Sequence, residues 1–199
     1  MHLRAPAILL SARPHGETAS IARLLTEEYG VVAGYVAGGR GRQMRPVTIP
    51  GNLVELQLSA RSDSQLPFAK LELVASRGPW LVEPLPAAAI GWATALTATA
   101  LPERNPYPTL YQALGALLDA ICHAPSARGW ARALLAYETL LLRELGYGGA
   151  APPQAEDLPA VLAALDRLAA PLDHYLLADR RGDVMAARTR LRDLLGRMN

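Results

Sequence analysis

The sequence predicts an α+β protein in which a small N-terminal β domain is followed by an all-helical domain. Apolar and polar residues alternate in short runs over the first third of the chain, as they do in half-buried strands. From Pro86 onward, apolar residues instead recur every three or four positions, as they do in amphipathic helices. Arg77, Gly78 and Pro79 separate the two patterns with turn-forming residues. We therefore expect one domain over residues 1–78 and another over residues 79–199.

Alternation indicates two strands directly. In residues 52–59, Val54, Leu56 and Leu58 alternate with polar side chains. The polar segment 60–67 that follows has the composition of a loop. A second strand is expected after it, with inward-facing side chains at Ala69, Leu71 and Leu73 and outward-facing ones at Lys70 and Glu72.

Two earlier segments are also candidate strands. Residues 31–37 form a short apolar run after Gly30. Residues 20–28 are ambiguous, because Ile21, Leu24 and Leu25 fit helical spacing whereas Ile21, Arg23 and Leu25 fit alternation. The pattern alone favours a helix over residues 20–28.

Helices are expected over residues 87–101, 108–123, 126–145, 158–178 and 184–197, with a break in the fourth at Pro171. Ser126 and Asp183 are candidate N-caps, and Gly146 is a candidate C-terminal stop. Gly146 also begins a linker of Gly, Ala and Pro that ends at Pro153.

The composition favours an ordered protein whose N-terminal part attracts polyanions. Apolar residues make up 51% of the chain and charged residues 19%, which is unlike a disordered chain. Residues 1–77 contain nine basic and six acidic groups, whereas residues 78–199 contain eleven and twelve. The positive field therefore belongs mainly to the β domain.

Several classes of function find no support in the sequence. Cys122 is the only cysteine, so we expect no disulfide, no multi-cysteine zinc site and a reducing cytoplasm. His15 and Glu17 have no nucleophile beside them at a recognisable spacing, and no P-loop or GxGxxG motif is present. We therefore expect neither catalysis nor a cofactor.

Two apolar runs raise the question of targeting or membrane insertion. Residues 5–10 are too few for a signal peptide. Residues 84–102 are uncharged but rich in Ala, Thr and Pro, so we expect a buried helix there and no membrane span.

The leading candidate for a binding site is the arginine loop, residues 38–45, where Arg40, Arg42 and Arg45 lie among glycines. Arginine offers a planar fork of donors that matches phosphate oxygens, and glycine lets a backbone approach closely. Tyr35, just before the loop, could stack on a base. The alternatives are a solvated hairpin tip for the arginines and a core or rim position for the tyrosine.

The helical domain holds two further pairs of arginines. Arg188 and Arg192 lie one turn apart and form a second candidate contact with nucleic acid, the alternative being a polar outer helix face. Arg128 and Arg132 have the same spacing on a leucine-rich helix. With the leucines of that helix they could receive an acidic peptide with a hydrophobic end; the alternative is an exposed ion pair with Glu138 or another acid. The leucines chosen for this peptide site are Leu135 and Leu142.

Three motifs occur in order near the N-terminus. They are Arg13, Pro14, Glu17 and Thr18; then Leu25, Thr26 and Gly30; then the basic, glycine-rich residues 38–45. Together with the apolar run before them, these motifs resemble the start of the RecO family of recombination mediators. The helical part resembles the family in patches, at the helix ending in Leu-Gly-Tyr-Gly and at residues 177–195. The positions that match in that helix are Tyr137, Glu138, Leu141, Leu142, Leu145 and Gly146.

The resemblance implies a five-stranded OB-type barrel, with a strand over residues 20–28, followed by helices. It implies a non-enzymatic, cytoplasmic, nucleoid-associated DNA repair protein of the RecF-type recombination pathway. Such a protein would bind single- and double-stranded DNA, anneal complementary strands and bind the C-terminal tail of single-stranded DNA-binding protein. With a RecR-like partner it would help load recombinase.

The sequence departs from the family after Gly148. Many relatives carry a cysteine-containing segment there, which in some forms a zinc site, whereas residues 149–153 contain no cysteine. A function of a different class also remains open: a diverged protein–protein adaptor whose barrel no longer binds nucleic acid. Salt-dependent affinity for DNA separates the two.

Overall fold

The computed structural model describes residues 2–60, 62, 65–148, 155, 157–178 and 184–198, and it divides into two compact units. The first contains Met1–Val82 and Leu101–Tyr111, and the second contains Glu83–Ala100 and Gln112–Asn199. The boundary expected after residue 78 falls inside a short 3-10 helix, η1 (Gly78–Val82). The barrel unit therefore continues to Val82, beyond the boundary expected from the sequence pattern. It also includes Leu101–Tyr111, which comes from the helical part of the chain.

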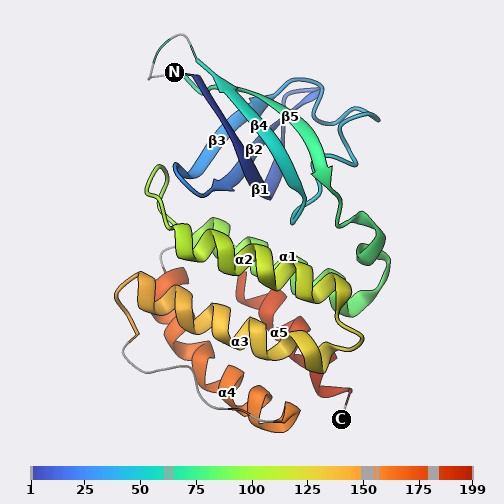
Figure 1. Cartoon of the computed structure of the whole chain (residues 1–199), viewed down its shortest axis with the longest axis vertical. Coiled ribbons are helices and arrows are strands. Elements are labelled where there is room, and N and C mark those ends of the chain that lie inside the picture. The colour runs from blue at the N-terminus through green and yellow to red at the C-terminus, as the bar shows by residue number, and fades with distance from the viewer. Residues whose placement is uncertain are drawn as a thin grey trace. The chain divides into compact units, whose positions relative to one another are not determined.

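Five strands form a closed barrel in the order β1-β2-β3-β5-β4 (Figure 1). Their bounds are His2–His15 for β1, Ala19–Thr26 for β2, Gly30–Val36 for β3, Leu53–Ser59 for β4 and Phe68–Ala75 for β5. Neighbouring strands are antiparallel, except that β3 and β5 are parallel and pair only at Tyr35 and Phe68. This order is that of an OB-type barrel and confirms the expected fold.

β2 confirms the strand that the family resemblance implied over residues 20–28. It pairs antiparallel with β1 on one side and with β3 on the other, and Ala22 and Leu24 are buried in the barrel core. The helical spacing in this segment is therefore misleading. Nine residues are too few for a stable isolated helix, so pairing on both edges decides the conformation.

The alternation in β4 and β5 is confirmed except at one position. Val54, Leu56 and Leu58 are buried in the barrel, as are Ala69 and Leu71. Leu73 was also expected to face inward, but 41% of it is exposed. Leu73 pairs with the buried Val54 and so keeps the inward parity, but it is the last residue before the register shift between Leu53 and Val54, where the regular β4–β5 pairing ends.

The Leu-Thr-x-x-x-Gly motif forms the β2–β3 turn. The Thr26 hydroxyl donates to the Gly30 carbonyl (3.0 Å) and accepts from the Tyr29 N–H (3.1 Å). Gly30 has a φ of +66°, and a Cβ at this position would lie 2.1 Å from the Asn105 carbonyl oxygen. Only glycine fits both constraints, so this turn seats the segment Leu101–Tyr111 against the barrel.

The second unit is helical (Figure 1), and its helices lie close to the expected ranges. The bounds are Pro84–Ala100 for α1, Pro108–His123 for α2, Ala127–Glu144 for α3, Leu158–Pro171 for α4 and Val184–Gly196 for α5. α2 begins in the barrel unit. α1 packs against α5, and α3 packs against α4. Within the described ranges, no helix has both the length and the apolar character needed to span a membrane.

The ends of the helices follow local chemistry. Ser126 precedes α3, but its side chain makes no capping hydrogen bond, whereas Asp157 caps α4 by accepting from the Ala160 N–H (2.8 Å). Gly146 ends α3 with a φ of +86°. The break expected at Pro171 is a change to a π-helix, η2 (Leu172–Leu177). The other predicted cap, Asp183, lies outside the described residues, as do the linker residues 149–153.

Candidate nucleic-acid interface

The arginine loop leaves the end of β3 in a series of tight turns. The Gly39 N–H donates to the Val36 carbonyl (3.2 Å), and the Gly41 N–H donates to that of Gly38 (2.8 Å). Gly38 has a φ of +63°, and a Cβ on the buried Gly39 would lie 2.6 Å from the Ser20 hydroxyl oxygen. These two glycines are therefore required by the path of the loop over β2, independently of any ligand.

All three arginines of the loop are exposed, but their surroundings differ. Arg40 donates from Nη1 to the carbonyls of Gly16 and Glu17 (3.1 and 3.0 Å), so it ties the loop to the β1–β2 turn. Arg45 donates from Nε to the Arg40 carbonyl (3.2 Å). Arg42 makes no polar contact with the described residues. Because each guanidinium has five donors, all three keep free donors for an anion.

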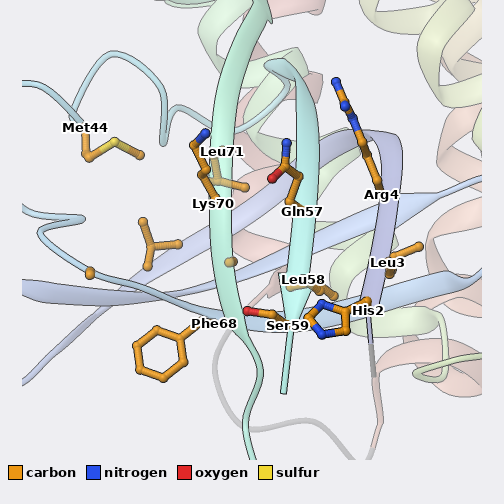
Figure 2. A pocket seen from close by; sticks show the side chains of 13 residues that line it. His2, Leu3, Arg4, Met44, Gln57, Leu58, Ser59, Phe68, Lys70 and Leu71 are labelled. Atoms are coloured by element: carbon orange, nitrogen blue, oxygen red, sulfur yellow. The ribbon is translucent and has the colours of Figure 1, made fainter. Parts of the chain in front are cut away.

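A groove of about 840 Å³ runs beside the loop and across β5, β4 and the start of β1 (Figure 2). We call it the barrel groove. Its polar and basic lining comes from His2, Arg4, Gln57, Ser59 and Lys70, and its apolar lining includes Met44, Phe68 and Leu71. Met44 also packs against the barrel core, which anchors the loop along this groove.

Tyr35 is half-buried and lies between two other rings. Its ring centroid is 5.9 Å from that of His15 and 5.2 Å from that of Phe68, both in edge-to-face geometry. Phe68 itself is 61% exposed. Tyr35 therefore lies at the rim of the barrel, as one of the alternatives expected. The Phe68 ring is more open to a ligand than that of Tyr35.

Sequence reasoning overlooked Phe68, although the pattern contains the information. Ala69 and Leu71 face inward in β5, so Phe68 has the outward parity that it shares with Lys70 and Glu72. Parity alone would therefore have identified Phe68 as an outward-facing aromatic side chain.

The fixed cations of the barrel groove are partly neutralised. Arg4 Nε lies 2.8 Å from Glu55 Oε1, and Lys70 Nζ lies 2.9 Å from Glu72 Oε1. The hydrogen bond from Lys70 lowers the pKa of Glu72, and the one to Glu55 raises the pKa of Arg4. Both pairs are exposed, so their exchange for contacts with an incoming anion costs little.

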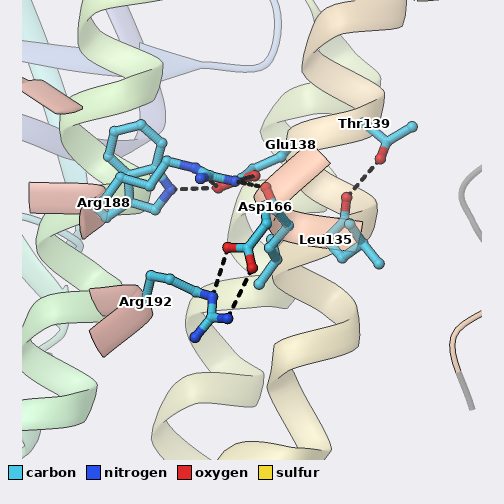
Figure 3. A network of polar contacts seen from close by, with 8 residues as sticks. Leu135, Glu138, Thr139, Asp166, Arg188 and Arg192 are labelled. Atoms are coloured by element: carbon cyan, nitrogen blue, oxygen red, sulfur yellow. Dashed lines mark hydrogen bonds and ion pairs between the residues drawn. The ribbon is translucent and has the colours of Figure 1, made fainter. Parts of the chain in front are cut away.

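Arg188 is not on the surface, and its predicted contact with nucleic acid is wrong. It is 5% exposed and forms a bidentate pair with the buried Glu138 on α3, with Nη2 2.7 Å from Oε2 and Nε 3.1 Å from Oε1 (Figure 3). The Trp92 indole N–H also donates to Glu138 Oε1 (2.7 Å), and Arg188 Nη2 donates to the Leu165 carbonyl (2.6 Å). Burial raises the pKa of Glu138, while Arg188 and Trp92 act against that shift.

The helical pattern could have located this pair. Arg188 precedes Leu191 and Leu195 by three and seven positions, so it lies on the buried face of α5. Glu138 likewise lies on the leucine-rich face of α3. Arg192, one turn on, is half-exposed and forms a bidentate pair with Asp166 (2.7 and 2.9 Å), which lowers the pKa of Asp166 (Figure 3).

The predicted peptide site is only partly on the surface. Arg128 and Arg132 are exposed on α3, but Leu135 and Leu142 are 2% and 4% exposed. These leucines pack inside the helical unit, so the prediction that they line an open groove is wrong. Of the alternative, an exposed ion pair with Glu138 or another acid, the part that names Glu138 is wrong, because Glu138 is fully buried.

The outer face of α5 carries a shallow hollow of about 640 Å³, which we call the α5 hollow. Met185 and Leu194 are half-buried within it, and Arg190 and Arg197 are exposed at its sides. The exposed Asp193 also lines it, so the hollow combines apolar surface with two basic side chains and one acidic side chain.

Metal binding receives no new support. Over the part of the chain that the structure covers, no three His, Cys, Asp or Glu side chains gather in a way that could hold a metal ion. Cys122 is buried in α2.

Comparison with known proteins yields two family models that match the chain in succession. One, described as "Recombination protein O N terminal", matches residues 1–77, and the other, "Recombination protein O C terminal", matches residues 85–150.

Several curated proteins are similar to the chain. It is 47% identical over 143 residues to the DNA repair protein RecO of Rhodospirillum centenum, which covers 71% of this chain and 56% of that protein. It is 42% identical over 149 residues to the DNA repair protein RecO of Ruegeria sp., covering 74% and 61%. For the DNA repair protein RecO of Gluconacetobacter diazotrophicus the identity is 38% over 151 residues, covering 74% and 59%. The chain thus spans about three fifths of the length of these relatives.

Proposed function

The chain belongs to the RecO family, and on this premise we propose that it is a non-enzymatic DNA repair protein that binds DNA through its barrel. In this proposal it binds single and double strands and anneals complementary strands. With a RecR-like partner it helps to load recombinase onto DNA coated by single-stranded DNA-binding protein. It would act in the cytoplasm, at the nucleoid.

The single observation that carries the proposal is the arginine loop beside the barrel groove. Three exposed guanidiniums lie at one end of a closed barrel whose domain has an excess of basic groups. A basic rim with adjoining aromatic rings is the surface that OB barrels use to follow a nucleic-acid backbone. Phosphate contacts of this kind release counterions, so the affinity should depend steeply on salt.

The partner in the helical unit is proposed to be the acidic, hydrophobic-ended tail of single-stranded DNA-binding protein. Because Leu135 and Leu142 are buried, the apolar contact must come from other side chains. The α5 hollow supports this role, since Met185 and Leu194 could receive an apolar end while Arg190 and Arg197 meet the acids. Arg128 and Arg132 are the alternative cations for the same tail.

The test is a titration of one labelled oligonucleotide, single-stranded and then as a duplex, at two salt concentrations. The proposed function predicts binding to both forms that weakens strongly at the higher salt. It also predicts faster annealing of complementary strands in the presence of the protein. No binding of either form at low salt would favour the adaptor alternative, in which the barrel has lost its nucleic-acid role.

A further inference from the structure

We infer that Phe68 is a stacking platform for an unpaired base, and that it makes the barrel groove prefer single strands to duplex. The inference rests on the proposed function, because it assigns a specificity to the same DNA-binding surface. It starts from the exposure of Phe68, which is the only phenylalanine of the chain and is 61% exposed.

The Phe68 ring is held in place although it is exposed. Phe68 is the residue at which β5 pairs with β3, opposite Tyr35, and the Tyr35 N–H donates to the neighbouring Pro67 carbonyl (2.7 Å). The Tyr35 ring contacts Phe68 edge-to-face, and His15 supports Tyr35 in the same way. A ring that is fixed before binding loses little conformational freedom when a base stacks on it.

The surroundings of Phe68 fit a nucleotide. Figure 2 shows Phe68 and Met44 on one side of β5, with Gln57, Ser59 and His2 on the strands across it. These polar side chains can hydrogen-bond to base edges, while Lys70 and Arg4 line the same groove and can meet phosphates. The arginine loop carries the exposed Arg42, and Met44 of that loop lines the groove, so a backbone held by the loop would have its bases near Phe68.

The geometry favours single strands for an energetic reason. Every base has an aromatic face, so stacking on a side chain is available to any unpaired base. In a duplex both faces of each base are covered by its neighbours, and exposing one requires unstacking and unpairing. Phe68 can therefore contribute to the binding of single strands while the arginines contribute to both forms.

The experiment compares wild type with Phe68→Ala on three ligands: an oligothymidine, the same length with abasic sites in its central portion, and a duplex. Stacking of one base predicts that Phe68→Ala weakens oligothymidine binding about fivefold to a hundredfold. Binding of the duplex and the abasic strand should change less than twofold, and the salt dependence should stay the same because no phosphate contact is removed. Val74→Ala is the matched control, since Val74 is an exposed apolar residue of the same strand.

Two further variants test whether the contact is stacking. Phe68→Trp should retain oligothymidine binding, whereas Phe68→Leu should lose it as Phe68→Ala does, because leucine has apolar bulk but no aromatic face. Full rescue by leucine, or an equal loss for all three ligands, would overturn the inference. Wild type that binds no DNA at all would instead overturn the proposed function. Unchanged binding of all three ligands by Phe68→Ala would leave DNA binding intact and remove Phe68 from it.

Discussion

At the scale of single residues, the turns of the barrel depend on glycines that have no substitute. Gly30 combines a positive φ with a contact to the Asn105 backbone that leaves no room for a side chain. Gly91, in the middle of α1, is the opposite case, because a Cβ there meets nothing within 4 Å.

The two glycines give a prediction with an internal control. Gly30→Ala should lower the free energy of unfolding by about 3 kcal/mol, from left-handed strain and the clash with Asn105. Gly91→Ala should raise it by about 0.5–1 kcal/mol, because glycine is unfavourable inside a helix. Chemical denaturation of both variants measures the difference. A Gly30→Ala protein as stable as wild type would mean that the turn does not seat the segment Leu101–Tyr111 as described.

The residue scale also shows what the sequence could predict. The alternation in β4 locates its buried side chains, and the same rule applied to β5 would have predicted that Phe68 faces outward. The helical pattern places Glu138 and Arg188 on buried faces, but their charge suggested the surface. The pairing of Arg188 with Glu138 joins α3 to α5, and a contact across fifty residues is not visible in any local pattern. The register shift that follows Leu73 is likewise a property of two strands together.

At the scale of elements, the buried pair of Glu138 and Arg188 fixes α5 against α3, and Trp92 adds a contact from α1. An apolar pair of the same size would hold the helices equally well, but only a bidentate ion pair requires one register of α5. Removing one partner leaves the other charge buried without compensation.

Arg188→Met should therefore destabilise the protein by about 3–5 kcal/mol at neutral pH. Without Arg188 the pKa of Glu138 rises further, so the folded state keeps a proton that the unfolded state releases. The stability of the variant should consequently fall as pH rises from 5 to 8. Thermal denaturation at both pH values measures this.

Two controls accompany Arg188→Met. The double variant with Glu138→Leu removes both charges, so it should recover most of the stability and lose the extra pH dependence. Arg192→Met, one turn away, breaks the more exposed pair with Asp166 and should cost no more than about 1 kcal/mol. Equal losses of stability for Arg188→Met and Arg192→Met would contradict the structural role of the buried ion pair between Glu138 and Arg188.

At the scale of the whole molecule, the two units have different proposed partners: DNA for the barrel unit and an acidic peptide for the helical unit. The change of periodicity in the sequence lies close to the end of the first segment of the barrel unit, but it gives no sign that Leu101–Tyr111 belongs to that unit. The location of the peptide site could not be predicted in this way, because helix α3 buries the leucines that its sequence offers.

The peptide site can be tested by two double variants that each remove two positive charges. Arg190→Ala with Arg197→Ala should weaken binding of the tail peptide by up to about thirtyfold, since exposed pairs contribute up to about 1 kcal/mol each. Arg128→Ala with Arg132→Ala should change it less. A peptide that lacks its terminal aromatic should bind more weakly to every form. Fluorescence anisotropy measures all of these, and the reverse ranking would move the site to α3.

Binding of DNA by the arginine loop is tested by the salt dependence of DNA affinity in the variant in which Arg40, Arg42 and Arg45 are all alanine. If the arginine loop contacts phosphates, each lost contact should lower the slope of log affinity against log salt by about 0.7–0.9, for single strands and duplex alike. Arg167→Ala, which removes an exposed charge from α4, should leave the slope unchanged. We predict a slope lower by about 2–3 in the triple variant, with circular dichroism like that of wild type. An unchanged slope with unchanged affinity would contradict this prediction.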